Sequence, residues 1–410
     1  MTMVLRSDDM RRRNRLTILQ VARRSGAISR SEIAQKAELS PATVSTITNG
    51  LIAEGVLISG GGENTAPAGR GRPSIALRMN PDFRHAILLI LKIGAITVAV
   101  ADYAGDLVVR EEHAFDMASV DRETFRATLS EHIRAARKAA GLDEDRLAHI
   151  AVAVQGTTDI GGTRMLWSPI TPLKDVPIGE WLETEFQVPV RLSNDCDLIA
   201  KALNWREPER YKTNFAAILL AHGVGMGLFL RGQVINGTRS SGTEFGHMVH
   251  AVDGDLCRCG SRGCVEAYAG DYAIIRRYRG EHHAAPPASP VDREEVETIA
   301  TAARAGDQRA IETFEAAGRA LGSGLAGIFA LVDPFRVAFV GHGAKAFDLM
   351  EPALRRTLRD SNAVNAETIP IDRFPNVMPL ILEGCGIGAL AEIDTDHAER
   401  IGETIGIANA

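Results

Sequence analysis

Cys257-Arg-Cys-Gly-Ser-Arg-Gly-Cys-Val-Glu266, preceded by Glu244-Phe-Gly-His247, is the stretch from which this 410-residue sequence is best interpreted. Three of the five cysteines lie within eight residues, and His247 lies ten residues before the first of them. Soft thiolates and one imidazole form the usual closed tetrahedral set around structural zinc. The spacing therefore predicts a structural zinc ion held by His247, Cys257, Cys259 and Cys264.

A disulfide plus a spare thiol is the alternative interpretation of the cluster. Disulfides are rare in the cytosol, and the chain is poor in cysteine and begins without the apolar segment of an export signal. No apolar run reaches the roughly 18–20 residues that a membrane span needs. We therefore expect a cytoplasmic protein with no membrane partner, and the length allows two or three domains.

Charge is distributed unevenly along the chain. Residues 1–80 contain 12 Lys+Arg and 6 Asp+Glu, whereas the remainder contains 34 basic and 46 acidic residues. A basic head on an acidic body is typical of a nucleic-acid-binding module joined to a part that must not bind nucleic acid. A basic surface that is only solvated and binds no partner is the alternative interpretation of this charge distribution.

The head has the pattern of a helix-turn-helix. A first helix ends near Ser25, Ser29 and Glu32 supply capping chemistry for a second, and Pro41 suits the first turn of a third. That third helix, through Leu51, is small and polar on its outer face, as a DNA-reading helix would be; a plain helical hairpin is the alternative. The residues expected to face DNA are Ser40, Pro41, Ala42, Thr43, Ser45 and Thr46.

Two short strands after the helices predict a wing. Residues 55–59 and 74–77 can pair around a Gly-rich tip that ends in Arg70-Gly71-Arg72-Pro73. An extended Arg-Gly-Arg segment suits the narrow, electronegative minor groove of A·T-rich DNA. We therefore expect Arg70 and Arg72 to contact DNA, and residues 1–80 to be a winged helix-turn-helix domain.

The body alternates buried-strand and helix patterns. Strands are expected at 86–93, 97–101, 149–154, 190–192, 215–220, 226–230 and 336–340, and helices at 124–140, 181–186, 293–305 and 307–332. Two such α/β sets predict two lobes with a cleft between them.

These motifs resemble the ROK family, which groups sugar-responsive transcriptional repressors with sugar kinases on a two-lobed, actin-like (ribonuclease H-like) fold. The resemblance rests on the two quoted stretches and on Ser193-Asn-Asp195, and it covers nearly the whole chain. It implies an α/β body behind the winged head. The first lobe is expected at 81–193, completed by a C-terminal helix near 388–410, and the second lobe with the zinc site at 194–387.

The resemblance also implies a sugar pocket. Carboxylates and amides suit sugar hydroxyls because they bind them in pairs. The family's pocket positions correspond to Asn194, Asp195, Glu244 and Glu266, and His247 is expected to contact sugar as well as zinc. Ile170, after Pro169, departs from an asparagine that family members often carry, so one hydroxyl contact is expected to be missing.

The phosphate loops of the family's kinases are altered. The first, Asp-x-Gly-Gly-Thr-Lys, corresponds here to a segment with Lys92 in place of the acid and Ile96 in place of the hydroxyl, and the second has His222 before Gly223. Asp195 matches the catalytic base, but without the polar contacts of the first loop we assign no catalytic residue.

The sequence thus predicts a transcriptional regulator, a repressor of carbohydrate transport or catabolism genes, rather than an enzyme. Its expected partners are an operator with an inverted repeat and A/T-rich flanks, a sugar or sugar phosphate effector, and further copies of itself in a homodimer or homotetramer. A cytoplasmic ATP-dependent sugar kinase with a DNA-binding head is the alternative. A protein-interaction scaffold with a vestigial cleft is a third, weaker one.

Overall fold

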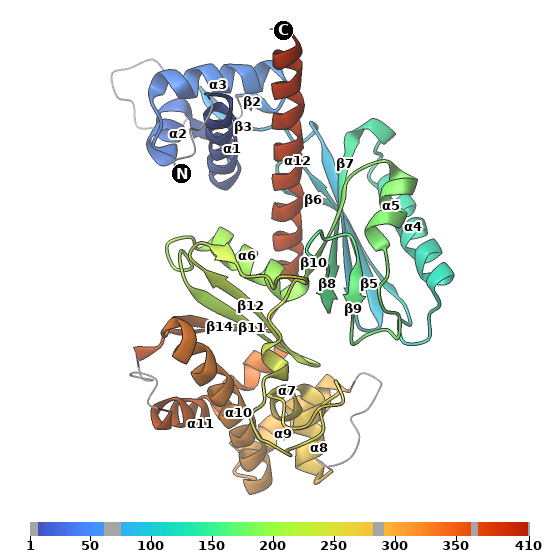
Figure 1. Cartoon of the computed structure of the whole chain (residues 1–410), viewed down its shortest axis with the longest axis vertical. Helices are drawn as coiled ribbons and strands as arrows, with labels where there is room; N and C mark the ends of the chain where they lie inside the picture. Colours follow the sequence, from blue (N-terminus) through green and yellow to red (C-terminus); the bar gives the residue numbers. More distant parts are fainter. Residues whose placement is uncertain (1–6, 61–74, 282–290, 362–367, 409–410) are drawn as a thin grey trace.

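The computed structural model describes residues 7–60, 75–281, 291–361 and 368–408. A small head at one end of the molecule, two α/β lobes and a long C-terminal helix that runs beside the head and the first lobe make up the fold (Figure 1). Among the described residues, no helix combines the length and the apolar character that crossing a membrane requires.

The head is a winged helix-turn-helix, as predicted. Ser29 and Glu32 form a reciprocal capping box at the start of the second helix, and the Ser40 side chain caps the third, which begins with Pro41. Three antiparallel strands in the order β1-β3-β2 complete it. Arg70 and Arg72 lie outside the described residues. The elements are α1 (Ser7–Ser25), β1 (Ile28–Ser29), α2 (Arg30–Ala37), α3 (Pro41–Ala53), β2 (Leu57–Ser59) and β3 (Ala76–Met79).

The first lobe is a five-stranded sheet in the order β10-β7-β4-β5-β6, in which β4, β7 and β10 run parallel. Alternate side chains of the central strands face opposite sides: Leu89 packs against the helix α4, and Leu88 packs against the C-terminal helix. The elements are β4 (His85–Lys92), β5 (Ala95–Asp102), β6 (Leu107–Ala114), α4 (Arg122–Ala139), η1 (Glu144–Arg146), β7 (Leu147–Val154), β8 (Thr157–Thr158), β9 (Met165–Trp167), α5 (Ile178–Phe186) and β10 (Val190–Asn194).

The second lobe is a five-stranded sheet in the order β13-β12-β11-β14-β15, packed against helices that share one hydrophobic core with it. Its elements are β11 (Phe215–Leu220), β12 (Val224–Leu230), β13 (Gln233–Val234), η2 (Phe245–His247), α7 (Glu266–Ala269), α8 (Asp271–Arg279), α9 (Arg293–Arg304), α10 (Gln308–Val332), β14 (Arg336–Val340), η3 (His342–Ala346), α11 (Phe347–Asp360) and β15 (Ile371–Phe374).

Two helices connect the parts. Helix α6 (Asp195–Arg206) follows β10 directly, and α12 (Met378–Ala408) packs along it and reaches the head. The sequence predicts the terminal helix only near 388–410, which is wrong at its start, because the glycines of residues 384–388 argue against a helix interior. They are accommodated because the two helices approach closely: a Cβ at Gly384 would overlap the carbonyl oxygen of Leu198.

Candidate effector pocket and metal centre

The four predicted metal ligands converge. The ligand atoms of His247, Cys257, Cys259 and Cys264 all lie within 4.8 Å of one another. The Sγ atoms of Cys259 and Cys264 are 3.7 Å apart, and so are the Cys257 Sγ and the His247 Nδ1. Bonds of about 2.0–2.3 Å to a tetrahedral zinc ion place neighbouring ligand atoms about 3.5–3.8 Å apart. The cluster therefore fits such an ion, whereas all five cysteines are free of disulfides.

The loop that presents the thiolates depends on one tight backbone contact. Gly263 has φ +75°, and a side chain there would overlap the backbone of Ala251. The amide groups of His250 and Ala251 donate to the Gly263 carbonyl, at 2.7 and 3.2 Å. This contact folds the segment after His247 back onto the cysteine loop, which is how residues ten positions apart reach one centre.

Glu266 is positioned between the metal cluster and the second-lobe sheet. Its Oε2 accepts a hydrogen bond from the Val224 amide (3.1 Å), and its Oε1 accepts one from the Tyr272 hydroxyl (3.3 Å). The same Oε1 lies 3.7 Å from the Cys257 Sγ. The residue is 8% exposed, and its carboxylate is positioned by the cysteine loop, by Tyr272 on α8 and by β12 together.

Asn194 and Asp195 stand where β10 ends and α6 begins. The Asn194 Oδ1 accepts from the amides of Cys196 (2.8 Å) and Asp197 (3.3 Å), and its Nδ2 donates to the Gly156 carbonyl (2.7 Å). The side chain thus caps α6, and a sugar contact from it stays a prediction. Asp195 is buried, and this burial raises the pKa of its carboxyl to about 6, the direction expected when the charged form is desolvated.

One pocket between the lobes brings the five predicted sugar residues together. Glu244 is half-exposed there, with its Oε2 3.7 Å from the His247 Nε2. Ile170 is buried in the first-lobe core, so it offers no polar group in place of the family's asparagine. The pocket is lined by Gln155, Gly156, Trp167, Pro169, Asn194, Asp195, Cys196, Leu219, Ala221, Gly223, Val224, Gly225, Met226, Gly242, Thr243, Glu244, His247, Arg258, Cys259 and Glu266.

Sequence reasoning missed most of the pocket lining, including the large side chains of Trp167 and Arg258. Trp167 comes from the first lobe, and its ring meets the His247 ring edge-on with centroids 6.4 Å apart. Arg258 stacks on the Tyr272 ring at 4.4 Å. The place of Arg258 between two metal-ligating cysteines was a usable signal, whereas nothing in the sequence around Trp167 marks it as a pocket residue.

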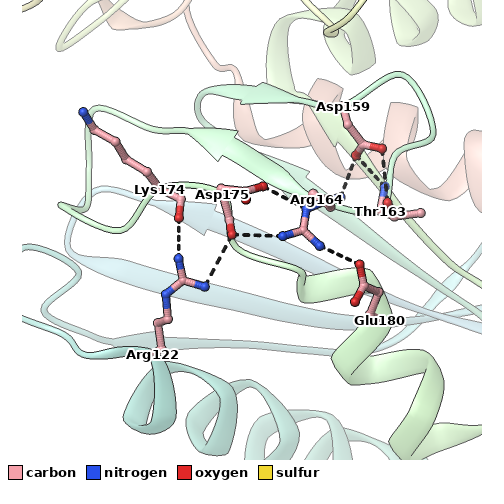
Figure 2. A network of polar contacts seen from close by, with 7 residues as sticks. All are labelled: Arg122, Asp159, Thr163, Arg164, Lys174, Asp175 and Glu180. Atoms are coloured by element: carbon pink, nitrogen blue, oxygen red, sulfur yellow. Dashed lines mark hydrogen bonds and ion pairs between the residues drawn. The ribbon is translucent and has the colours of Figure 1, made fainter.

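A polar network lies around the loop between β8 and β9 in the first lobe (Figure 2). Asp159 accepts from the amides of Thr163 (2.8 Å) and Arg164 (2.6 Å), and the Arg164 guanidinium donates to Asp175 (2.8 Å) and Glu180 (2.6 Å). The network fastens the β8–β9 hairpin to the start of α5.

The same hairpin is also fastened to the second lobe. The Thr158 hydroxyl and the Ser241 hydroxyl lie 2.7 Å apart, and the Thr158 amide donates to the Ser241 Oγ at 3.0 Å. Ser241 lies three residues before Glu244, so the two walls of the pocket are joined next to that carboxylate.

Three residues lie in the segments that the sequence predicts to correspond to the family's phosphate loops. Lys92 forms an ion pair with Glu112 on β6 (2.7 Å), and Ile96 is fully buried in the first-lobe core. His222 is buried, and burial lowers its pKa to about 4, so the imidazole is neutral near pH 7. Neither Lys92 nor Ile96 lines the pocket.

A winged-helix head on two α/β lobes of the sugar-kinase, actin-like fold, with a His/Cys₃ cluster beside the cleft, defines a class of regulators built on a kinase-like body. The chain belongs to the ROK family, whose sequence pattern matches residues 91–372.

Two curated relatives of the chain are transcriptional regulators by name. The chain is 26% identical over 387 residues to the DNA-binding transcriptional dual regulator NagC of Escherichia coli K12, covering 94% of this chain and 93% of that one. It is 26% identical over 262 residues to a putative xylose repressor of Caldicellulosiruptor sp. Rt8B.4, covering 64% of this chain and 65%, just under two thirds, of that repressor.

Two solved structures match different shares of this chain. A crystal structure of a ROK family transcriptional regulator, described as a homologue of the E. coli MLC protein, matches 94% of this chain and 97% of its own with a TM-score of 0.76 at 23% identity. A ROK family glucokinase from Streptomyces griseus, in complex with glucose and AMPPNP, matches 74% of this chain and 99% of its own with a TM-score of 0.60 at 22% identity. The regulator shares nearly the whole fold, whereas the kinase shares about three quarters of it.

Proposed function

We propose that this protein is a transcriptional repressor of carbohydrate-metabolism genes whose effector is a sugar, or a sugar phosphate, bound in the cleft between the lobes. The observation that carries the proposal is the presence in one chain of a winged helix and of a cleft walled by carboxylates beside a metal cluster. The family relatives named as repressors support it, because NagC aligns through both parts.

The head would bind duplex DNA with α3 in the major groove. The residues of the head that the sequence predicts to face the major groove lie on this helix and its cap, and Ser40, Pro41, Ala42 and Thr46 are exposed. Arg70 and Arg72 would reach the flanking minor groove. The proposal includes a homodimer or homotetramer bound to an inverted repeat with A/T-rich flanks, because two-fold symmetric regulators bind symmetric half-sites, and it includes a cytoplasmic location.

The effector pocket would bind sugar hydroxyls through Asp195, Glu244 and Glu266, with Asn194 and His247 completing the set. The metal that fits the cluster is zinc, and its proposed role is structural: it would hold His247 and the cysteine loop so that Glu244 and Glu266 face the cleft.

Helix α6 supplies the route from this pocket to the head. Asp195 stands at its N-terminus in the pocket, and at its C-terminus Arg24 of the head donates to the Asn204 carbonyl (3.5 Å) and covers the Trp205 ring at 4.5 Å. Beside it, Asp394 of α12 binds Arg23 of the head at 2.6 and 3.0 Å. A sugar that shifts α6 would therefore alter the placement of the head, which is a coupling between two sites.

A thermal-shift screen of sugars and sugar phosphates tests the pocket. We expect one compound to raise the thermal midpoint by about 3 °C at a hundredfold excess over its Kd. Glu244→Ala should abolish that shift and the compound's effect on DNA binding, while DNA binding itself remains; Glu131→Ala, an exposed glutamate on α4, is the matched control. If no compound shifts the midpoint at millimolar concentration, the cleft is not an effector site.

A sugar kinase is the second candidate, because Asp195 stands at the family's base position and its pKa of about 6 suits a general base. We expect no turnover in a coupled assay with ATP-Mg²⁺ and a panel of hexoses and amino sugars, because Lys92 and Ile96 replace the polar groups of the phosphate loop. Turnover that rises with pH through about 6 and disappears in Asp195→Asn would establish the kinase instead.

A further inference from the structure

Asn49, on the outer surface of α3, has its side-chain amide held in one orientation. The Arg30 Nη2 donates to the Asn49 Oδ1 at 2.9 Å. A guanidinium has only donors, so the amide oxygen must face Arg30, and the Nδ2 group is the end that remains for another partner.

Arg30 is itself fixed by the core of the head. Its Nε donates to the Thr48 Oγ1 at 2.9 Å, and Thr48 is fully buried with its hydroxyl donating to the Val44 carbonyl at 2.7 Å. The buried Thr48 therefore holds the partly buried Arg30, and Arg30 holds the exposed amide of Asn49. Such a series sets the position of the amide before any ligand arrives, which lowers the entropic cost of binding.

Asn49 lies on the same face of α3 as two residues that the sequence predicts to face DNA. Ala42, Thr46 and Asn49 are spaced by four and three residues, so they lie in one row on a helix of 3.6 residues per turn. All three are exposed. The row extends the predicted DNA-facing set, which ends at Thr46, by one helical turn.

We propose that Asn49 reads one operator base as a hydrogen-bond donor only, with guanine as the preferred base, and that Arg30 is its positioning residue. This inference rests on the proposed DNA-binding function. An asparagine with both ends free pairs with adenine, accepting from N6 and donating to N7. Here the accepting end is occupied by a cation, which disfavours the adenine amino group and favours the O6 and N7 acceptors of guanine.

The test is selection of binding sites from a library of random-sequence duplexes, followed by binding measurements on the selected sites. The wild-type protein should select guanine at one position of each half-site. Asn49→Ala should lose that preference at this position alone, with a loss of about tenfold in affinity for the wild-type site. Arg30→Met frees the Asn49 oxygen and should move the preference toward adenine.

Two further variants make the outcome decisive. Asn49→Asp keeps the partner of Arg30 and nearly the same shape but offers only acceptors, so its preference should move from guanine to cytosine. Lys36→Met removes a positive charge from the exposed side of α2 and should leave the base preference unchanged. Unaltered preferences in both Asn49 variants, or a uniform loss of affinity for all sequences, would overturn the proposal. A wild-type protein that selects no sequence would overturn DNA binding itself.

Discussion

Replacing Cys257 with serine is expected to release the metal and to lower the thermal midpoint by roughly 5–10 °C. Structural zinc contributes about 10–16 kcal/mol of apparent binding free energy in small metal-dependent domains, and that energy is coupled to folding. Loss of about 5–8 kcal/mol, roughly half of that binding energy, would produce a shift of this size in a protein of this length. Cys257 is buried, and its Sγ lies close to both His247 and Glu266, so serine would disturb the pocket as well as the metal.

Metal analysis and differential scanning calorimetry measure the two effects. Cys385→Ala is the control, because Cys385 is an equally buried thiol that lies on α12, away from the cluster. It should keep the metal in full. A Cys257→Ser protein that retains one metal per chain would show that this ligand set is wrong.

Asp394→Ala is expected to destabilise the protein by about 3–5 kcal/mol, because it leaves a buried guanidinium without its partner. Arg23 and Asp394 have side chains only 6% exposed, and the Tyr103 hydroxyl also donates to Asp394, at 2.5 Å. The Asp394 carboxylate therefore links α12 to the head through Arg23 and to the first lobe through Tyr103. Burial further raises the pKa of Tyr103, so the phenol stays a donor to this carboxylate at physiological pH.

Urea unfolding gives the loss of stability, and limited proteolysis of the head shows whether the head has detached. Glu399→Ala breaks a pair with Arg12 whose side chains are 50% and 40% exposed, and it should cost less than about 1 kcal/mol. Arg23→Met combined with Asp394→Leu should restore most of the stability, because no charge is left buried. An equal cost for Asp394→Ala and Glu399→Ala would mean that this pair does not join the head to the body.

Local sequence patterns predicted most of the elements, because their causes are local. Alternating and continuous apolar runs predicted β4, β5, β7 and β11, and capping residues such as Ser29 predicted the helices of the head. The metal cluster was also predictable, since three of its four ligands lie within eight residues.

Contacts between distant segments were not predictable in this way. Arg23 and Asp394 are 371 positions apart, and neither lies in a motif. Trp167 reaches the pocket only because the β8–β9 hairpin is fastened to both lobes. Asn194 lines the pocket, but the bond from its Nδ2 to the Gly156 carbonyl, 38 positions away, had no local signal.

The close backbone packing around α6 determines how stiff the connection between pocket and head can be. A Cβ at Gly384 would overlap the backbone of α6 from α12, and a Cβ at Gly227 would overlap it from β12 at Cys196. With main chain against main chain on two sides, few side-chain rotamers are available to absorb a small displacement of this helix. A small shift of α6 at one end would therefore be passed to the other, and a methyl group added at Gly384 would press on the Leu198 backbone without lying in the pocket.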